Sequence, residues 1–72
     1  MEINTKAVND LIEEKYRGNK TWFAEELDVD RSYLSMILNG KKKKKDSKKI
    51  IDHLIIYCQK NHLDYKNYIF LP

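Results

Sequence analysis

The sequence predicts an all-α fold, a compact bundle of about five short helices that forms one domain over residues 1–72. Apolar residues recur at spacings of three and four in several segments, and such spacing places them on one face of an α-helix. Residues that cap helix N-termini precede these segments, and Gly18 and Asn39-Gly40 stand where two of them end. A chain of this length buries only a modest core, so a partner subunit can add to its stability.

Two short helices joined by a tight turn are expected in residues 20–40, at the centre of the chain. Asn19 and Asp30 can each accept a hydrogen bond from the first backbone N–H groups of the helix that follows. The turn, Asp28-Val29-Asp30, is too short for a strand and too polar to continue a helix. The apolar residues at helical spacing are Phe23, Ala24 and Leu27 in the first helix and Leu34, Ile37 and Leu38 in the second.

The second of these helices has two unlike sides. One side carries the apolar residues Leu34, Ile37 and Leu38, with Tyr33 at its margin. The opposite side carries a guanidinium, two hydroxyls and a thioether, from Arg31, Ser32, Ser35 and Met36. Arginine pairs well with guanine, serine bonds several bases, and an apolar group can contact the thymine methyl. The sequence therefore predicts that these four residues contact DNA bases, Arg31 a guanine and Met36 a thymine methyl.

Residues 19–40 resemble the helix-turn-helix of the phage repressor and Cro (XRE-type) family. Ala24 is the small residue that this motif places in its first helix, and Val29 is the apolar residue that follows the turn. Asn39-Gly40 matches the frequent exit of the motif, and its other apolar positions are filled by Phe23, Leu27, Leu34 and Ile37. Asp28 departs from the family, which usually has Gly there. Asp enters the left-handed backbone region at some cost, whereas Gly enters it freely.

The resemblance implies a lambda-repressor-like fold and a sequence-specific transcriptional regulator, like a Cro protein or short repressor, that binds double-stranded DNA. The recognition helix, about residues 31–38, would lie in the major groove. A homodimer on a pseudo-palindromic site, a bacterial or phage origin and a cytoplasmic location are expected, without cofactor, membrane or small-molecule substrate. The predicted phosphate contacts are Asn19, Lys20, Thr21, Asn39, Lys41, Lys42, Lys43 and Lys44. The predicted dimer contacts are Tyr65, Tyr68, Phe70 and Leu71.

The charge distribution supports a phosphate-binding region after the second helix. Residues 1–40 carry five Lys or Arg and eight Asp or Glu, a net charge of −3, whereas residues 41–72 carry nine Lys and three Asp, a net charge of +6. Lysines 41–45 form an unbroken run that would repel itself as a helix, so we expect a loop there. A basic segment beside a candidate recognition helix is typical of phosphate binding.

The flanking segments are expected to close the core. Residues 1–4 read as a lead-in. A first helix is expected from Thr5 to about Tyr16, with Thr5 as its candidate N-cap, and the longest helix is expected over about residues 47–61. Residues 63–72 include a turn capped by Asp64 and an apolar tail that either folds on the core or meets a second subunit. Trp22 lies off the apolar face of its helix. It is expected to be half-buried against the first or the fourth helix, the alternatives being a phosphate contact or a dimer surface.

Several other functions find little support in the sequence. A single cysteine excludes an intrachain disulfide, and the first residues lack the apolar run of a signal peptide. Cys58 and His62 are four residues apart, but the further ligands of a structural zinc site and the third residue of a catalytic triad are missing. We therefore expect no metal and no enzyme activity. The alternative to DNA binding is a helix-turn-helix module that binds a protein, such as an antitoxin or antirepressor.

Overall fold

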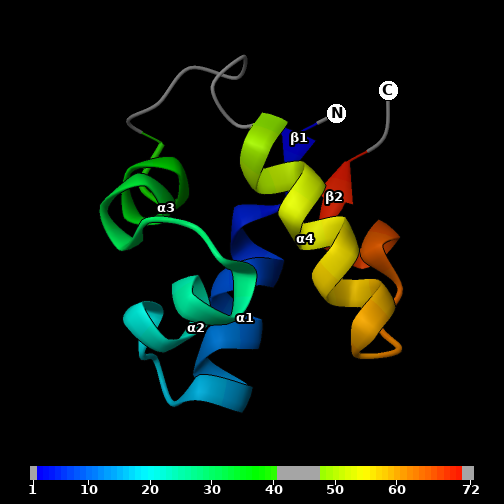
Figure 1. Ribbon diagram of the computed structural model, residues 1–72, viewed down its shortest axis with the longest axis horizontal. Helices are drawn as coiled ribbons and strands as arrows, with labels where there is room; N and C mark the ends of the chain where they lie inside the picture. Colours follow the sequence, from blue (N-terminus) through cyan, green and yellow to red (C-terminus); the bar gives the residue numbers. More distant parts are fainter. Residues whose placement is uncertain (1, 41–47, 71–72) are drawn as a thin grey trace.

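A computed structural model describes residues 2–40 and 48–70, and within them the chain is mostly helical (Figure 1). The elements are β1 (Glu2–Ile3), α1 (Thr5–Tyr16), α2 (Lys20–Leu27), α3 (Arg31–Leu38), α4 (Lys48–Lys60), the 3-10 turn η2 (Tyr65–Asn67) and β2 (Ile69–Phe70). The predicted number of about five helices is wrong for this part of the chain. It has four α-helices, because the segment after α4 forms only one 3-10 turn and a short strand.

The N-cap of α1 is Asn4 rather than the predicted Thr5. The Asn4 side chain accepts a hydrogen bond from the Ala7 N–H at 3.2 Å, and Thr5 is already the first helical residue. The helix ends at Tyr16 because the next two residues, Arg17 and Gly18, both have left-handed backbone conformations, with φ of 53° and 80°. Two such residues in succession turn the chain sharply into α2.

A three-residue turn joins α2 to α3, and side chains cap both helices as predicted. The Asn19 side chain accepts from the Trp22 N–H at 3.1 Å, and the Asp30 carboxylate accepts from the Ser32 N–H at 2.6 Å. Asp28 ends α2 with a φ of 61°, the left-handed conformation that Gly enters most freely. The direction of α3 relative to α2 is therefore set by local backbone chemistry as well as by packing.

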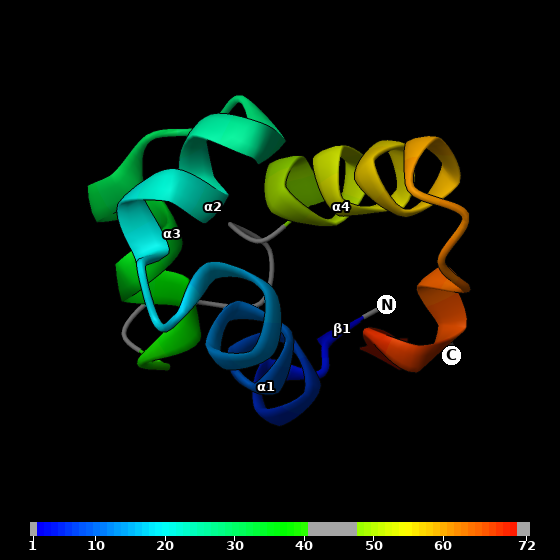
Figure 2. The same cartoon turned by 90° about the horizontal axis from the view of Figure 1, so that it is seen from below.

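The core lies between the four α-helices, and α2 packs against each of the other three (Figure 2). An aromatic group connects α1, α2 and α4. Tyr16 lies edge-on to Trp22 at a ring-centroid distance of 4.9 Å, and Phe23 lies edge-on to Tyr57 at 5.4 Å. Trp22 is 46% exposed, so the prediction of a half-buried tryptophan against the first helix is confirmed.

A buried pair of hydroxyls closes the contact between α1 and α4. The Tyr16 and Tyr57 oxygens are 2.6 Å apart, a short hydrogen bond in which either can be the donor. Each hydroxyl satisfies the other in a region from which water is largely excluded, with Tyr16 8% and Tyr57 4% exposed. Nothing local in the sequence predicts this pair, because 41 positions separate its members.

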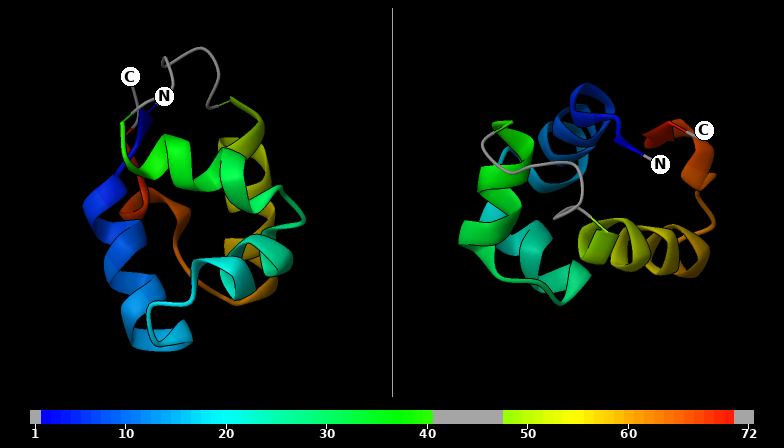
Figure 3. Two further views of the ribbon diagram at one scale, coloured as in Figure 1. Left: turned by 90° about the vertical axis from the view of Figure 1, so that its left-hand side faces the viewer. Right: turned by 90° about the horizontal axis from the view of Figure 1, so that it is seen from above.

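The two ends of the described chain are joined by a small antiparallel sheet (Figure 3). Glu2 pairs with Phe70 and Ile3 with Ile69, so residues 1–4 are not the simple lead-in that the sequence suggests. The tail before this strand turns at η2, where the Asp64 side chain accepts from the Lys66 N–H at 3.0 Å as predicted. Ile69 is only 2% exposed, so this part of the tail folds onto the core.

Within residues 2–40 and 48–70, no helix has both the length and the apolar character to cross a membrane.

Candidate nucleic-acid interface

The two sides of α3 face different surroundings. The inner side is buried, with Leu34 fully enclosed and Ile37 and Leu38 each 7% exposed. The predicted base-contacting residues lie on the outer side, where Arg31, Ser32 and Met36 are exposed and Ser35 is half-buried. The helix is anchored by three aliphatic side chains and by its Asp30 cap, so its outer side is free to contact another molecule.

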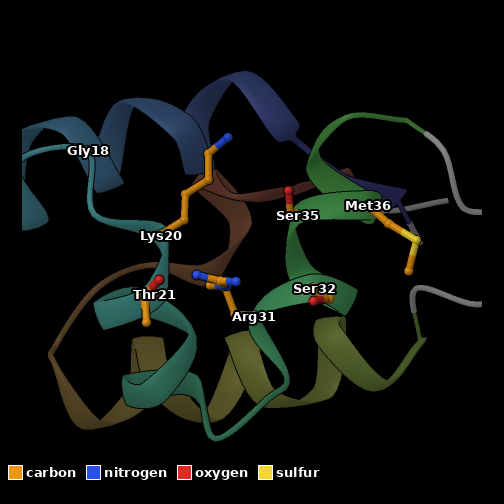
Figure 4. Close-up of a pocket in the computed structure, with 7 residues that line it drawn as sticks. All are labelled: Gly18, Lys20, Thr21, Arg31, Ser32, Ser35 and Met36. Atoms are coloured by element: carbon orange, nitrogen blue, oxygen red, sulfur yellow. The ribbon is translucent and has the colours of Figure 1, made fainter.

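An open hollow of about 600 Å³, which we call the α2–α3 hollow, lies between the N-terminus of α2 and the outer side of α3 (Figure 4). It is lined by Gly18, Lys20, Thr21, Arg31, Ser32, Ser35 and Met36. All four residues predicted to contact bases are among them, together with two of those predicted to contact phosphate. Residues separated by up to 18 positions in the sequence thus share one surface.

The side chains that line the α2–α3 hollow are cationic, neutral polar or apolar. Lys20 and Arg31 supply two positive charges, and none of the seven residues that line the hollow has a carboxylate. The Arg31 side chain extends from α3 toward α2, where its guanidinium lies near Thr21, whereas the Lys20 side chain extends from the start of α2 toward α1 (Figure 4). Like charges that face one space favour a bound anion, so the hollow suits a phosphate group.

A second, smaller hollow of about 430 Å³ lies on the other flank of α3 and reaches α4; we call it the α3–α4 hollow. Among the described residues that line this hollow, Lys49 in the first turn of α4 is the one cation. The Asp30 carboxylate also lines this hollow, but it already accepts hydrogen bonds from the backbone N–H groups of Ser32 and Tyr33. Ser32 and Met36 line both hollows, so they form a ridge with a positive charge on either side.

Asn19 and Asn39 stand at the ends of the helices that frame the α2–α3 hollow. The Asn19 oxygen caps α2, so its amide N–H groups are the part that remains for a phosphate. The Asn39 amide donates to the Ser35 hydroxyl at 3.4 Å, a long contact that ties a predicted phosphate ligand to a predicted base ligand. The other predicted phosphate ligands, Lys41, Lys42, Lys43 and Lys44, lie outside the described residues.

The predicted dimer residues are not all on one exposed surface. Tyr65 and Tyr68 are partly buried and pack against the core, whereas Phe70 is 55% exposed. Ile56, on the outer side of α4, is also exposed, at 52%. Leu71 lies outside the described residues. Among the predicted residues that the structure describes, Phe70 is therefore the exposed one.

Cys58 is enclosed in the core and does not face either hollow. Its side chain is 0% exposed, and burial, with a smaller effect of the Asp64 charge, raises the pKa of its thiol. A protonated and enclosed thiol is a poor nucleophile and a poor metal ligand. In the parts of the chain that the structure covers, no three His, Cys, Asp or Glu side chains are grouped so as to hold a metal ion.

Sequence reasoning did not assign Gly18, Tyr33 or Lys49 to the site, although all three line one of the hollows. Lys49 carried a signal, because a lysine in the first turn of a helix opposes the helix dipole. Tyr33 lay at the margin of the helical wheel, and it is half-buried in the structure. Gly18 contributes backbone only, so its position in the hollow depends on how α1 turns into α2.

Comparison of the chain with models of protein families, with curated proteins and with solved structures gave no match.

Proposed function

We propose that the protein is a sequence-specific DNA-binding transcriptional regulator whose α2, turn and α3 act as a helix-turn-helix. In this proposal α3 lies in the major groove, and Ser32, Ser35 and Met36 on its outer side face the base edges. The observation that carries the proposal is the α2–α3 hollow. It gathers hydroxyl, thioether and cationic side chains on one open face and has no carboxylate among the residues that line it.

The cations on both flanks of the Ser32–Met36 ridge support this orientation. A major groove about 12 Å wide is bordered by two phosphate backbones. Lys20 and Thr21 would contact one backbone from the α2–α3 hollow, and Lys49 would contact the other from the α3–α4 hollow. Lysines 41–45 would add phosphate contacts between α3 and α4, which increase affinity without reading sequence.

A homodimer is part of the proposal. A helix of eight residues such as α3 contacts only a few base pairs, so useful specificity calls for two copies on half-sites about one helical turn apart. The exposed Phe70 on β2 is the described tail residue available for the contact between subunits.

The test is a binding-site selection with the purified protein on random DNA duplexes, followed by titration of the enriched duplex at two salt concentrations. We expect an enriched pseudo-palindrome and an affinity that falls steeply with salt. Lys20→Ala should weaken binding to all duplexes alike and reduce the salt dependence, whereas Lys60→Ala, at the far end of α4, should change neither. Weak binding to all sequences without enrichment would contradict the proposal.

A protein-binding module is the second candidate, and exposed apolar side chains favour it. Met36 is 36% exposed on the outer side of α3, and Trp22 is 46% exposed at the start of α2. If selection yields no DNA site, these residues become the expected contacts of a protein partner. Met36→Ala would then weaken the protein complex and leave DNA binding unaffected.

A further inference from the structure

Arg31 is oriented differently from the other predicted base-contacting residues. It is the first residue of α3, and its side chain leaves the helix toward α2, where its guanidinium lies near Thr21 (Figure 4). Met36 projects from the far end of the same face, away from this group. The guanidinium therefore belongs to the cationic flank of the α2–α3 hollow, while the middle of the outer side is occupied by Ser32 and Ser35.

The chemistry of this flank suits an anion better than a base edge. A guanidinium can bond a phosphate through two parallel N–H groups, and a nearby ammonium and hydroxyl can supply further donors to the same oxygens. A guanine edge offers two acceptors, which one guanidinium satisfies alone, so it would not use the Lys20 and Thr21 side chains that line the same hollow. A phosphate would be shared by all three side chains.

We propose that Arg31 binds a backbone phosphate of DNA together with Lys20 and Thr21, and that it does not read a guanine. This inference rests on the proposed function and replaces the guanine contact expected from the sequence. It leaves the reading of bases to Ser32, Ser35 and Met36. Because serine hydroxyls bond several bases, the base preference that follows is for a thymine at the Met36 contact, toward the C-terminal end of α3.

The phosphate site can be tested without DNA, because the chain has only two arginines, Arg17 and Arg31. Arg17 is exposed and does not line the hollow, so it serves as an internal control. Titration of the ¹⁵N-labelled protein with inorganic phosphate should shift the Arg31 Nε–H signal and leave that of Arg17 almost unchanged. Lys20→Ala should reduce the shift of Arg31. Equal responses of the two arginines, or none at Arg31, would overturn the proposal.

The role of Arg31 on DNA is tested by comparing two substitutions with a matched control. Arg31→Lys keeps a cation that can bond a phosphate as a point charge, so it should retain part of the affinity and select the same duplex as the wild-type protein. Arg31→Ala should weaken binding to preferred and random duplexes by the same factor. Because each subunit of the proposed homodimer loses one phosphate contact, the salt slope should fall by about 1.8, so a fourfold rise in salt should reduce affinity about 12-fold less than in the wild type. Arg17→Ala should show neither effect.

The outcomes separate this inference from the proposed function. If the wild-type protein selects a site and Arg31→Ala loses preference at one G·C pair, Arg31 reads guanine. The regulator proposal then stands and the phosphate assignment fails. If the wild-type protein selects no site but the Arg31 signal still responds to inorganic phosphate, the anion site stands and the regulator proposal fails.

Discussion

Leu34, Ile37 and Leu38 on the inner side of α3 are at most 7% exposed, whereas Arg31, Ser32 and Met36 on its outer side face solvent. The inner side chains are aliphatic and fix the helix by removing apolar surface from water. The outer side chains carry donors, acceptors and a flexible thioether, and the fold does not depend on their packing. The stability of the fold and the proposed recognition of DNA therefore depend on opposite sides of one eight-residue helix. Substitutions on the two sides should therefore have separable effects.

The largest expected effect comes from removing a side chain from the inner side. Leu34→Ala should lower the free energy of unfolding by about 2–5 kcal/mol, because Leu34 is fully buried and the change leaves a cavity. The matched control is Ser35→Ala, one residue along the helix, which should change stability by no more than about 0.5 kcal/mol. Chemical denaturation measures both. Equal losses at the two positions would contradict the division between the two sides.

The buried hydroxyl pair behind α2 should give the next largest effect. Tyr57→Phe should cost about 1–3 kcal/mol of unfolding free energy, because it leaves the Tyr16 hydroxyl buried without its partner. The double variant Tyr16→Phe with Tyr57→Phe should be more stable than the sum of the single losses predicts, because no hydroxyl is then left unpaired. Additive losses would show that the pair does not act as a unit.

The same pair predicts how stability depends on pH in the alkaline range. Burial, followed by the hydrogen bond to Tyr16, raises the pKa of Tyr57 well above its ordinary value of 10.0. The unfolded chain therefore releases this proton first, so the contribution of Tyr57 to stability is fully present below pH 10 and is lost as the pH rises above it. Denaturation curves between pH 8 and about 11 should show a steeper decline for the wild type than for Tyr57→Phe. If the stability of the wild type and of Tyr57→Phe falls equally steeply with pH, the raised pKa of Tyr57 is contradicted.

A substitution in the turn before α3 should have a smaller effect on the free energy of unfolding, and it should stabilise the fold. Asp28→Gly should stabilise the fold by about 0.5–1 kcal/mol, because residue 28 has a left-handed backbone at the C-terminus of α2. Asp28→Asn serves as the control, since it removes the charge but keeps a side chain. Its gain should be smaller than that of Gly. Thermal denaturation ranks the stabilities of the two variants and the wild type. Destabilisation by Gly would show that the Asp28 carboxylate has a stabilising contact.

The smallest effect on stability is expected on the outer side of α3. Met36→Ala should change the free energy of unfolding by less than about 0.5 kcal/mol, because the side chain is already 36% exposed. The same substitution should weaken the preference for the selected DNA site several-fold. A large loss of stability would show that Met36 belongs to the core rather than to the recognition surface.

The sequence predicts the helices and their local chemistry well. The caps at Asn19, Asp30 and Asp64 follow from residue types next to apolar periodicity, and the structure confirms all three. The inner and outer sides of α3 follow from the same periodicity. The N-cap of α1 was misplaced by one residue because Asn4 and Thr5 are both good caps, and their order alone does not decide between them.

Features that join distant parts of the chain could not be predicted in this way. Two strands of two residues have too few positions to show an alternating pattern, so the pairing of Ile3 with Ile69 left no local signal. The Tyr16–Tyr57 hydrogen bond is equally non-local. For the site, the sequence supplied the outer residues of α3, but their proximity to Lys20 and Thr21 depends on the packing of α2 against α3.

The small sheet between the chain ends has a consequence for the order of folding. Ile3 and Ile69 are 66 positions apart, so their pairing closes a loop that includes nearly the whole chain. Closure of a loop of that length costs roughly 4 kcal/mol of chain entropy, and a pair of two-residue strands returns few hydrogen bonds in exchange. The four helices, whose contacts are mostly closer in sequence, must first bring the ends together. We therefore expect β1 and β2 to pair last as the protein folds, and their amide protons and that of Asn4, which is bonded to the Tyr68 carbonyl, to exchange with solvent before those of the core.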